Sequence, residues 1–293
     1  MAVLAALLSG PLEQGLAYGI MVLGVYLSFR ILNFADLTVD GSFPLGGAVA
    51  ATLVVAGVNP ALATAAGFGA GLLAGAATAF LATKARIAPL LAGILTMTAL
   101  YSINLRVMGR ANIQLLRQTT LVSLVQDQAL GGDYAVLLFL AVAAIALAAV
   151  LWWFLRTSLG SALRAVGDNE DMIRSLGVDT DLAKVLGLAL SNGLVALSGA
   201  LVAQYQGFAD VGMGIGTIVA GLASVIVGEV VVGEATVGRA LAGVLAGSVI
   251  YRLAVFAALR TGFAPTDLKL MTALLVILAL ATPRLKRVLR LAS

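Results

Sequence analysis

Five acidic residues lie close to long apolar segments of this chain, where a charge is costly. They are Asp36, Asp40, Asp210, Glu229 and Glu234. Carboxylates in such places are candidates for holding a proton or a cation, or for lining a polar pathway. The alternative is that they lie in the headgroup layer and only mark the ends of spans, which we favour for Glu229 and Glu234. For Asp36 and Asp40 both interpretations stay open, because the Asp40–Gly41 pair is also typical of a turn.

Several amides extend this set. If the apolar segments are interrupted helices, a pathway can be lined by polar residues from three stretches, namely Asn33, Asp36, Asp40, Gln204, Gln206 and Asp210. Asn192 and its neighbour Ser191 fall in the middle of another apolar segment. There they either face the interior or join helices by hydrogen bonds.

Other kinds of chemistry are excluded by residue type. The chain has no cysteine and no histidine, which removes thiol chemistry, disulfides, Cys/His metal sites and histidine acid–base catalysis. None of its four lysines follows a glycine, so it has no phosphate-binding loop of its own. We therefore expect no catalytic residues, no metal site and no cofactor bound by this chain.

The bulk composition indicates an all-α integral membrane protein. Of 293 residues, 61% are hydrophobic and only 11% are charged, with a mean hydropathy of +1.07. Such a chain predicts one transmembrane domain over residues 1–293, a helical bundle of about eight to ten spans of about 20 residues each. The net charge of +4 does not indicate nucleic-acid binding, because the basic residues sit at span ends. The N-terminus lacks a basic region and is expected to belong to the mature chain.

Nine apolar segments follow along the chain. They cover roughly residues 12–29, 45–58, 61–83, 89–108, 134–155, 182–205, 212–232, 238–259 and 268–282. The second is short, and the seventh begins with three closely spaced glycines, which predicts broken or re-entrant helices. The stretches NFADLTVDGSFPLGGA, from Asn33, and GFADVGMGIGTIVAGLA, from Gly207, resemble each other. They are either an inverted repeat, as in many transporters, or a chance similarity.

A long polar stretch, residues 157–184, separates the two halves of the chain. Nine charged residues fall between Arg156 and Lys184, so this stretch must lie in water. Its centre predicts a short helix, with Asp168 as N-cap, acidic residues in the first turn and Gly177 at the C-terminus. An apolar patch on this helix suits docking into a groove of a partner. The predicted docking residues are Asp168, Asn169, Glu170, Asp171, Met172, Ile173 and Leu176. The alternative is a surface loop whose apolar residues lie on the membrane.

The distribution of basic residues predicts the orientation. If the C-terminal tail is cytoplasmic and nine spans alternate backwards from it, twelve Lys and Arg residues lie inside and six outside. Residues 157–184 are then a cytoplasmic loop. The N-terminus lies outside if the count of nine is right.

Residues 158–208 carry a recognisable pattern. Gly160, Ala162, Arg164, Ala165, Gly167 and Asn169 match a G-x-A-x-R-A-x-G-x-N motif, and Leu32–Ala35 matches an early INFA-like motif. The chain resembles permease subunits of bacterial ABC importers of the branched-chain amino acid and monosaccharide class. NFADLTVDGSFPLGGA is similar to a subgroup linked to aromatic amino acid uptake. The sequence departs from the usual pattern at Asp36, which replaces a His-Gly, and at Glu229 and Glu234, where small residues are common.

The resemblance implies a set of partners and adds Phe34 to the candidate pathway residues. It implies a homodimer or a pair with a paralogous permease, and an external substrate-binding protein. It also implies a P-loop ATPase that binds ATP and magnesium. Residues 168–176 would dock on this ATPase as a coupling helix. The location would be the bacterial cytoplasmic membrane. The substrate would be an aromatic or branched-chain amino acid, although nucleosides or sugars stay open. The alternative function is an ion-coupled secondary transporter, in which Asp36, Asp40 or Asp210 takes up protons or cations. An intramembrane enzyme is disfavoured by the missing residue types.

Overall fold

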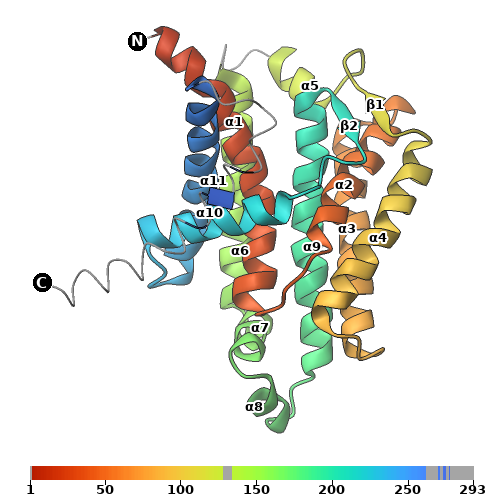
Figure 1. The fold of residues 1–293 in the computed structure, drawn as a ribbon, viewed down its shortest axis with the longest axis vertical. Helices are drawn as coiled ribbons and strands as arrows, with labels where there is room; N and C mark the ends of the chain where they lie inside the picture. Colours follow the sequence, from red (N-terminus) through yellow and green to blue (C-terminus); the bar gives the residue numbers. More distant parts are fainter. Residues whose placement is uncertain (1, 128–133, 262–269, 271–272, 275–276, 278–293) are drawn as a thin grey trace, which may run out of the picture.

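The computed structural model describes residues 2–127, 134–261, 270, 273–274 and 277, and Figure 1 shows its fold. The described part is almost entirely helical. Its elements are α1 (Ala2–Val25), the π-helical turn η1 (Tyr26–Ile31), α2 (Val39–Val55), α3 (Pro60–Thr83), α4 (Pro89–Met108), β1 (Asn112–Gln114), α5 (Leu121–Asp127), α6 (Ala135–Arg156), α7 (Ser158–Asp168), α8 (Glu170–Ser175), α9 (Thr180–Gln206), β2 (Phe208–Asp210), α10 (Thr217–Val232) and α11 (Val237–Arg260).

The predicted class, a polytopic helical membrane protein, is confirmed. Among the described residues, six helices are long and apolar enough to cross a membrane: α1 with η1, α3, α4, α6, α9 and α11. The shorter apolar helices α2 and α10 bring the number of apolar segments to eight, and they fall where the sequence predicts interrupted helices. The predicted ninth span, residues 268–282, and the basic tail lie largely outside the described residues.

Helix α9 forms the centre of the bundle. It packs against α1, α2 and α3. In its most apolar stretch of 18 residues the buried share is 72%, whereas in α4, at the edge of the bundle, it is 28%. Small residues allow this close packing. A Cβ on Gly46 of α2 would overlap the carbonyl of Ala196, and a Cβ on Gly199 of α9 would overlap the carbonyl of Phe43. The helices α2 and α9 are therefore in backbone contact.

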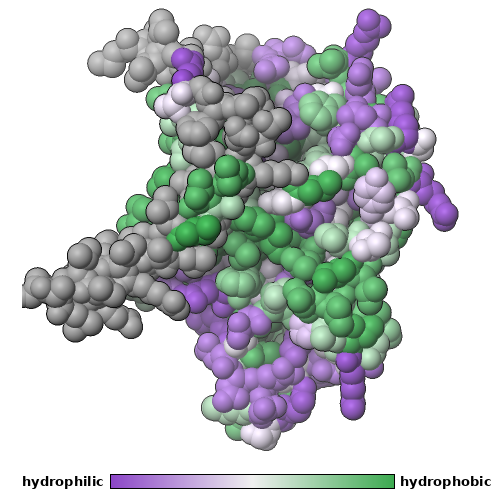
Figure 2. Space-filling model, viewed as in Figure 1, coloured by the Kyte–Doolittle hydropathy of each residue, from purple (hydrophilic) through white to green (hydrophobic). Residues whose placement is uncertain are grey.

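The bundle has two polar ends. One, the α8 end, carries α7 and α8 at the bottom of Figure 1, and the other, the strand end, carries α5 and the antiparallel pair β1–β2. In Figure 2 hydrophilic side chains gather at both ends, and hydrophobic ones lie between them. The order of the helices places eight described basic residues on the α8 side: Arg30, Lys84, Arg86, Arg156, Arg164, Arg174, Lys184 and Arg239. Five lie on the strand side: Arg106, Arg110, Arg117, Arg252 and Arg260.

One predicted boundary is wrong, and one helix was not predicted. The second apolar helix begins at Val39 rather than Leu45 and continues through Pro44, so Asp40 and Gly41 are helical and form no turn. Pro44 lies in the second turn, where it removes the bond that its N–H would make to the carbonyl of Asp40, and the helix continues through it. The polar stretch 157–184 contains two helices, the amphipathic α7 and the short α8, in place of a loop with one helix.

Candidate transport and docking sites

The N-termini of the two short helices meet in the interior of the bundle. Asp40, in the first turn of α2, accepts hydrogen bonds from the start of α10: its Oδ2 from Gly216 N at 2.9 Å, and its Oδ1 from Ile218 N at 2.8 Å and Thr217 Oγ1 at 3.0 Å. A carboxylate at this place satisfies free backbone N–H groups and offsets the positive end of the helix dipole. Gly214 permits the approach, since a Cβ there would overlap the carbonyl of Asp40. Asp40 thus holds α10 against α2.

Asp36 and Asn192 form a second buried polar cluster one turn away along the chain. Asp36 Oδ2 accepts from Asn192 Nδ2 at 2.6 Å, and its Oδ1 accepts from Thr38 N at 2.9 Å. Asn192 Oδ1 in turn accepts from Ser42 Oγ at 2.7 Å. These residues are at most 2% exposed. The cluster connects the linker before α2, α2 itself and the centre of α9, so Asn192 joins helices as one of its two interpretations predicts.

The remaining predicted pathway residues are not brought to this place. Gln204 is buried near the strand end, where it donates to Thr64 Oγ1 and accepts from Leu121 N, and Gln206 ends α9 nearby. Asp210 lies in β2 and accepts from Gly212 N within a turn. Asn33 is exposed in the left-handed backbone region with φ 52°, and Phe34 is buried near the α8 end against α7. Of the eight candidates, the structure therefore brings Asp36, Asp40 and Asn192 close to the meeting helices.

Glu229 and Glu234 have a common partner. Arg30, in η1, lies 2.9 Å from Glu229 Oε1 through its Nε and also pairs with Glu234. All three belong to the α8 side of the bundle, where η1 and α10 both end. Two carboxylates that share an arginine at the edge of the bundle fit the interpretation that these acids mark span ends.

The helix α8 is short and well capped, but its N-cap differs from the prediction. Asp168 is the last residue of α7, and Asn169 is the cap, since its Oδ1 accepts from Met172 N at 3.0 Å. Asn169 adopts extended backbone angles that separate the two helices, which a cap residue requires. Glu170 and Asp171 occupy the first turn, and Gly177 follows the helix with φ 84°, as predicted.

The apolar patch of α8 is divided between solvent and the bundle. Met172 and Leu176 are 57% and 68% exposed, whereas Ile173 packs against the buried cluster around Leu163 and Val166. Ile173 therefore anchors α8 to α7. Met172 and Leu176 remain as an exposed apolar pair at α8, the helix at the tip of the bundle in Figure 1.

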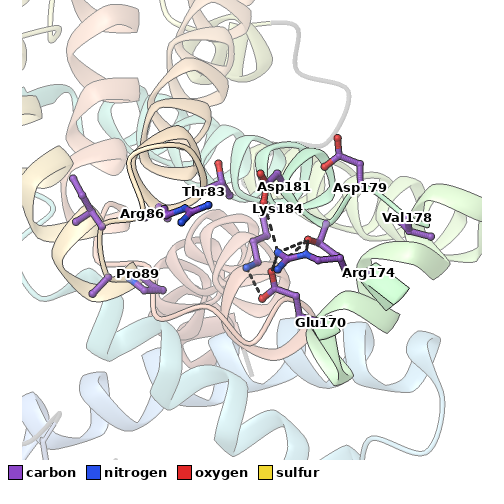
Figure 3. A pocket seen from close by; sticks show the side chains of 13 residues that line it. Thr83, Arg86, Pro89, Glu170, Arg174, Val178, Asp179, Asp181 and Lys184 are labelled. Atoms are coloured by element: carbon purple, nitrogen blue, oxygen red, sulfur yellow. Dashed lines mark hydrogen bonds and ion pairs between the residues drawn. The ribbon is translucent and has the colours of Figure 1, made fainter. Parts of the chain in front are cut away.

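A cleft of about 720 Å³ lies beside α8, between the α3–α4 connection and the start of α9. In Figure 3 the side chains of Glu170, Arg174 and Lys184 point toward one another across it. Glu170 accepts from Lys184 Nζ at 2.6 Å and from Arg174 at 2.8 Å, and Lys84 pairs with Asp181 at 3.0 Å. Ion pairs thus connect α8 to α9, and α9 to the end of α3.

Some contributing residues were missed from the sequence. Ser42, Thr217 and Lys184 carry hydrogen bonds or ion pairs in these sites, and none was singled out. Ser42 and Thr217 are polar residues inside apolar helices, which is the signal that could have found them. For Lys184 no local signal existed, because its partner Glu170 is fourteen residues away.

The comparison with known proteins decides the family. Residues 7–281 match the family described as branched-chain amino acid transport system, permease component. The chain belongs to this family. Its members are permeases of ABC transporters, and the ATPase and substrate-binding partners of such transporters are separate from the permease, so the chain is a transport subunit and not an enzyme.

Individual relatives agree with this assignment. The chain is 42% identical over 275 residues to the tyrosine transport system permease protein of Clostridioides difficile (strain R20291), covering 94% of this chain and 90% of the relative. It is 28% identical over 220 residues to the ribose import permease protein of Bacillus subtilis (strain 168), covering 74% and 66%. A galactofuranose transporter permease protein of Escherichia coli (strain K12) is 30% identical over 172 residues, 57% of this chain and 48% of the relative. No solved structure matches the chain.

Proposed function

We propose that this permease imports an amino acid, of the aromatic class, in a complex with a P-loop ATPase and an external substrate-binding protein. The amino acid follows from the family and from the relative named a tyrosine transport permease. The protein lies in a bacterial inner membrane with its α8 end facing the cytoplasm, because eight of the thirteen described basic residues are on that side. The C-terminal tail lies on the same side, and a second permease, identical or paralogous, completes the complex.

The exposed pair Met172 and Leu176 carries the docking part of this proposal. A water-exposed helix end that keeps two large apolar side chains uncovered suits a groove on a partner. The residues around it, Asp168 to Leu176, form the coupling helix and its cap. ATP and magnesium are bound in the partner, not in this chain.

The transport part rests on polar contacts that lead from α8 to the meeting point of α2 and α10. Glu170 joins α8 to Lys184 on α9, and Asn192 on the same helix binds both Asp36 and Ser42. Asp40, two residues before Ser42, then holds α10. A displacement of α8 by the ATPase would therefore move α9 and α2 together and shift the start of α10.

An ion-coupled mechanism is less well supported by the same geometry. Asp36 and Asp40 are both engaged by protein donors, two on Asp36 and three on Asp40. A carboxylate that takes up a coupling ion needs free acceptor capacity, which these bonds reduce.

The test is reconstitution of the purified complex. The chain is purified in mild detergent, the ATPase that accompanies it is identified by mass spectrometry, and the complex is placed in proteoliposomes with its binding protein. We expect uptake of L-tyrosine that needs ATP and is unaffected by dissipating proton and sodium gradients. Uptake driven by an ion gradient without an ATPase would contradict the proposal.

Glu170→Gln should separate ATP hydrolysis from transport. The change removes the charge that pairs with Lys184 and Arg174. Arg174 is exposed and Glu170 and Lys184 are half-buried, and ion pairs near a protein surface stabilise the fold by only about 0–1 kcal/mol each. We expect an unchanged amount of protein in the membrane, ATP hydrolysis near normal, and severalfold less uptake per ATP. Asp127→Asn, which neutralises an exposed acid at the strand end, is the matched control and should leave this ratio unchanged.

A further inference from the structure

A second cavity lies beside the meeting point of the two short helices, and it involves residues of α4 that the sequence analysis did not single out. Its volume is about 370 Å³, at the lower end of the range of about 300–1,000 Å³ for small-molecule sites. The start of α2 contributes Asp40, Gly41 and Pro44, and the loop before α10 contributes Val211 and Ile215. The remaining lining comes from one face of α4, between Met97 and Asn104.

Helix α4 has two different faces. Leu95, Ala99 and Ile103 line an apolar groove that is compatible with lipid. Thr98, Tyr101 and Ser102, at helical spacing on the other side, are exposed and line the cavity. Thr98 Oγ1 donates to Ile94 O within the helix, so the polar character of this face depends on Tyr101 and Ser102. A hydroxyl group is costly to place in hydrocarbon without a hydrogen-bond partner. The polar face of α4 therefore indicates a hydrated space at this place.

A buried amide supplies an independent sign of a ligand. Asn104 is fully buried, lines the cavity and donates through Nδ2 to the carbonyl of Gly41 at 3.2 Å. Its Oδ1 has no hydrogen-bond partner among the described residues. An unsatisfied buried acceptor is costly, and a donor from a bound molecule would remove the cost.

We propose that this cavity is a transient binding site for the transported amino acid inside the permease. The site holds an acceptor at Asn104, and it has no basic residue. The oxygens of Asp40 remain bonded to α10, so Asp40 contributes its nearby negative charge and not a direct contact. Both features suit an ammonium group. The hydroxyls of Tyr101 and Ser102 would bind the carboxylate of the ligand. Met97 and Ile215 would contact an apolar or aromatic side chain. This proposal rests on the proposed function and extends it to a specific place on α4.

Two neighbouring substitutions test the site in the complete transporter. Ser102→Trp fills the cavity, whereas Ile103→Trp places the same side chain on the lipid-facing groove one residue away. Uptake of labelled L-tyrosine and ATP hydrolysis are measured in proteoliposomes that contain the ATPase and the binding protein. We expect Ser102→Trp to reduce uptake to background with basal ATP hydrolysis and assembly retained, and Ile103→Trp to behave like the unchanged chain.

A labelling experiment reports on occupancy directly. The chain has no cysteine, so Ser102→Cys introduces its only thiol. A water-soluble methanethiosulfonate reagent should modify that thiol in the assembled transporter, and L-tyrosine should slow the reaction severalfold, whereas D-ribose should not. Tyr101→Ala should weaken this protection about tenfold, the effect of losing one hydrogen bond and its packing.

The outcomes separate the site from the function. Normal uptake by the Ser102→Trp variant, or labelling that L-tyrosine does not slow, would overturn the proposed binding site. ATP-driven uptake of L-tyrosine by the unchanged chain would still support the proposed function in that case. Equal loss of uptake in the Ile103→Trp variant would also overturn it, because the effect would then not depend on the cavity. Uptake of D-ribose in place of L-tyrosine by the unchanged chain would overturn the proposed substrate class and the ligand assigned to this cavity.

Discussion

Replacing Met172 and Leu176 together by aspartate should abolish uptake without removing the permease from the membrane. Both side chains are mostly exposed in the isolated chain, so the fold loses little packing when they change. If they are the anchors of the ATPase interface, each contributes about 2 kcal/mol or more. Losing about 4 kcal/mol lowers the affinity for the ATPase about a thousandfold. Co-purification of the ATPase and uptake in cells measure the two effects.

The control for this variant uses the same kind of change at the other end of the bundle. Leu116 is 80% exposed at the strand end, and Leu116→Asp makes the same kind of replacement once, adding one of the two negative charges of the double variant. We expect the Leu116→Asp protein to keep both the ATPase and uptake. Ile173 is a poor choice for the test, because it packs against α7 and its loss would disturb the fold. A Met172→Asp, Leu176→Asp double variant that still purifies with the ATPase and takes up substrate would disprove the docking role of α8.

The helices were largely predictable from the sequence because apolar segment length alone marks a membrane helix. The two short helices were also identified in advance, the first by its length and the second by the glycines before it. The start of α2 was misplaced, because Asp40, Gly41 and Pro44 suggest a turn when they are considered locally. In the structure Asp40 satisfies the N-terminus of a helix 176 residues later, and no local pattern carries that information.

The candidate sites were predictable to a smaller extent. The acidic start and apolar residues of α8 are local signals, so the short helix was predicted, although its cap is Asn169 instead of Asp168. Its docking role stays a prediction. The pathway residues depend on how distant helices meet. Asp36 and Asn192 are 156 residues apart in the chain, whereas Gln206 and Asp210 resemble them in type but lie at the strand end. The polar face of α4 was missed because three hydroxyl side chains in an apolar helix carry no charge signal. The inverted repeat stays a prediction, favoured by two short helices whose N-termini meet.

Asp40→Ala should disable transport by releasing the start of α10. The carboxylate accepts two backbone bonds and one hydroxyl bond from residues 216–218. Loss of a cap of this kind costs about 2 kcal/mol, and more where the N–H groups remain buried. We expect a melting temperature several degrees lower for the detergent-purified protein and uptake close to background. Asp210→Ala removes an acid that accepts one backbone bond within its own turn and one exposed bond from Asn112 Nδ2, and it should change both quantities much less.

Asp40→Asn distinguishes capping from ion coupling at the same position. An asparagine keeps one acceptor oxygen, which can still bind N–H groups of α10, but it carries no charge and cannot take up a proton. If Asp40 acts as a cap, its asparagine variant should retain part of the stability and part of the uptake. If Asp40 were an ion-coupling acid, asparagine and alanine would abolish uptake equally, and the asparagine variant would do so with its stability preserved. Uptake measured together with thermal stability for both variants therefore separates a carboxylate that positions a half-helix from one that carries an ion.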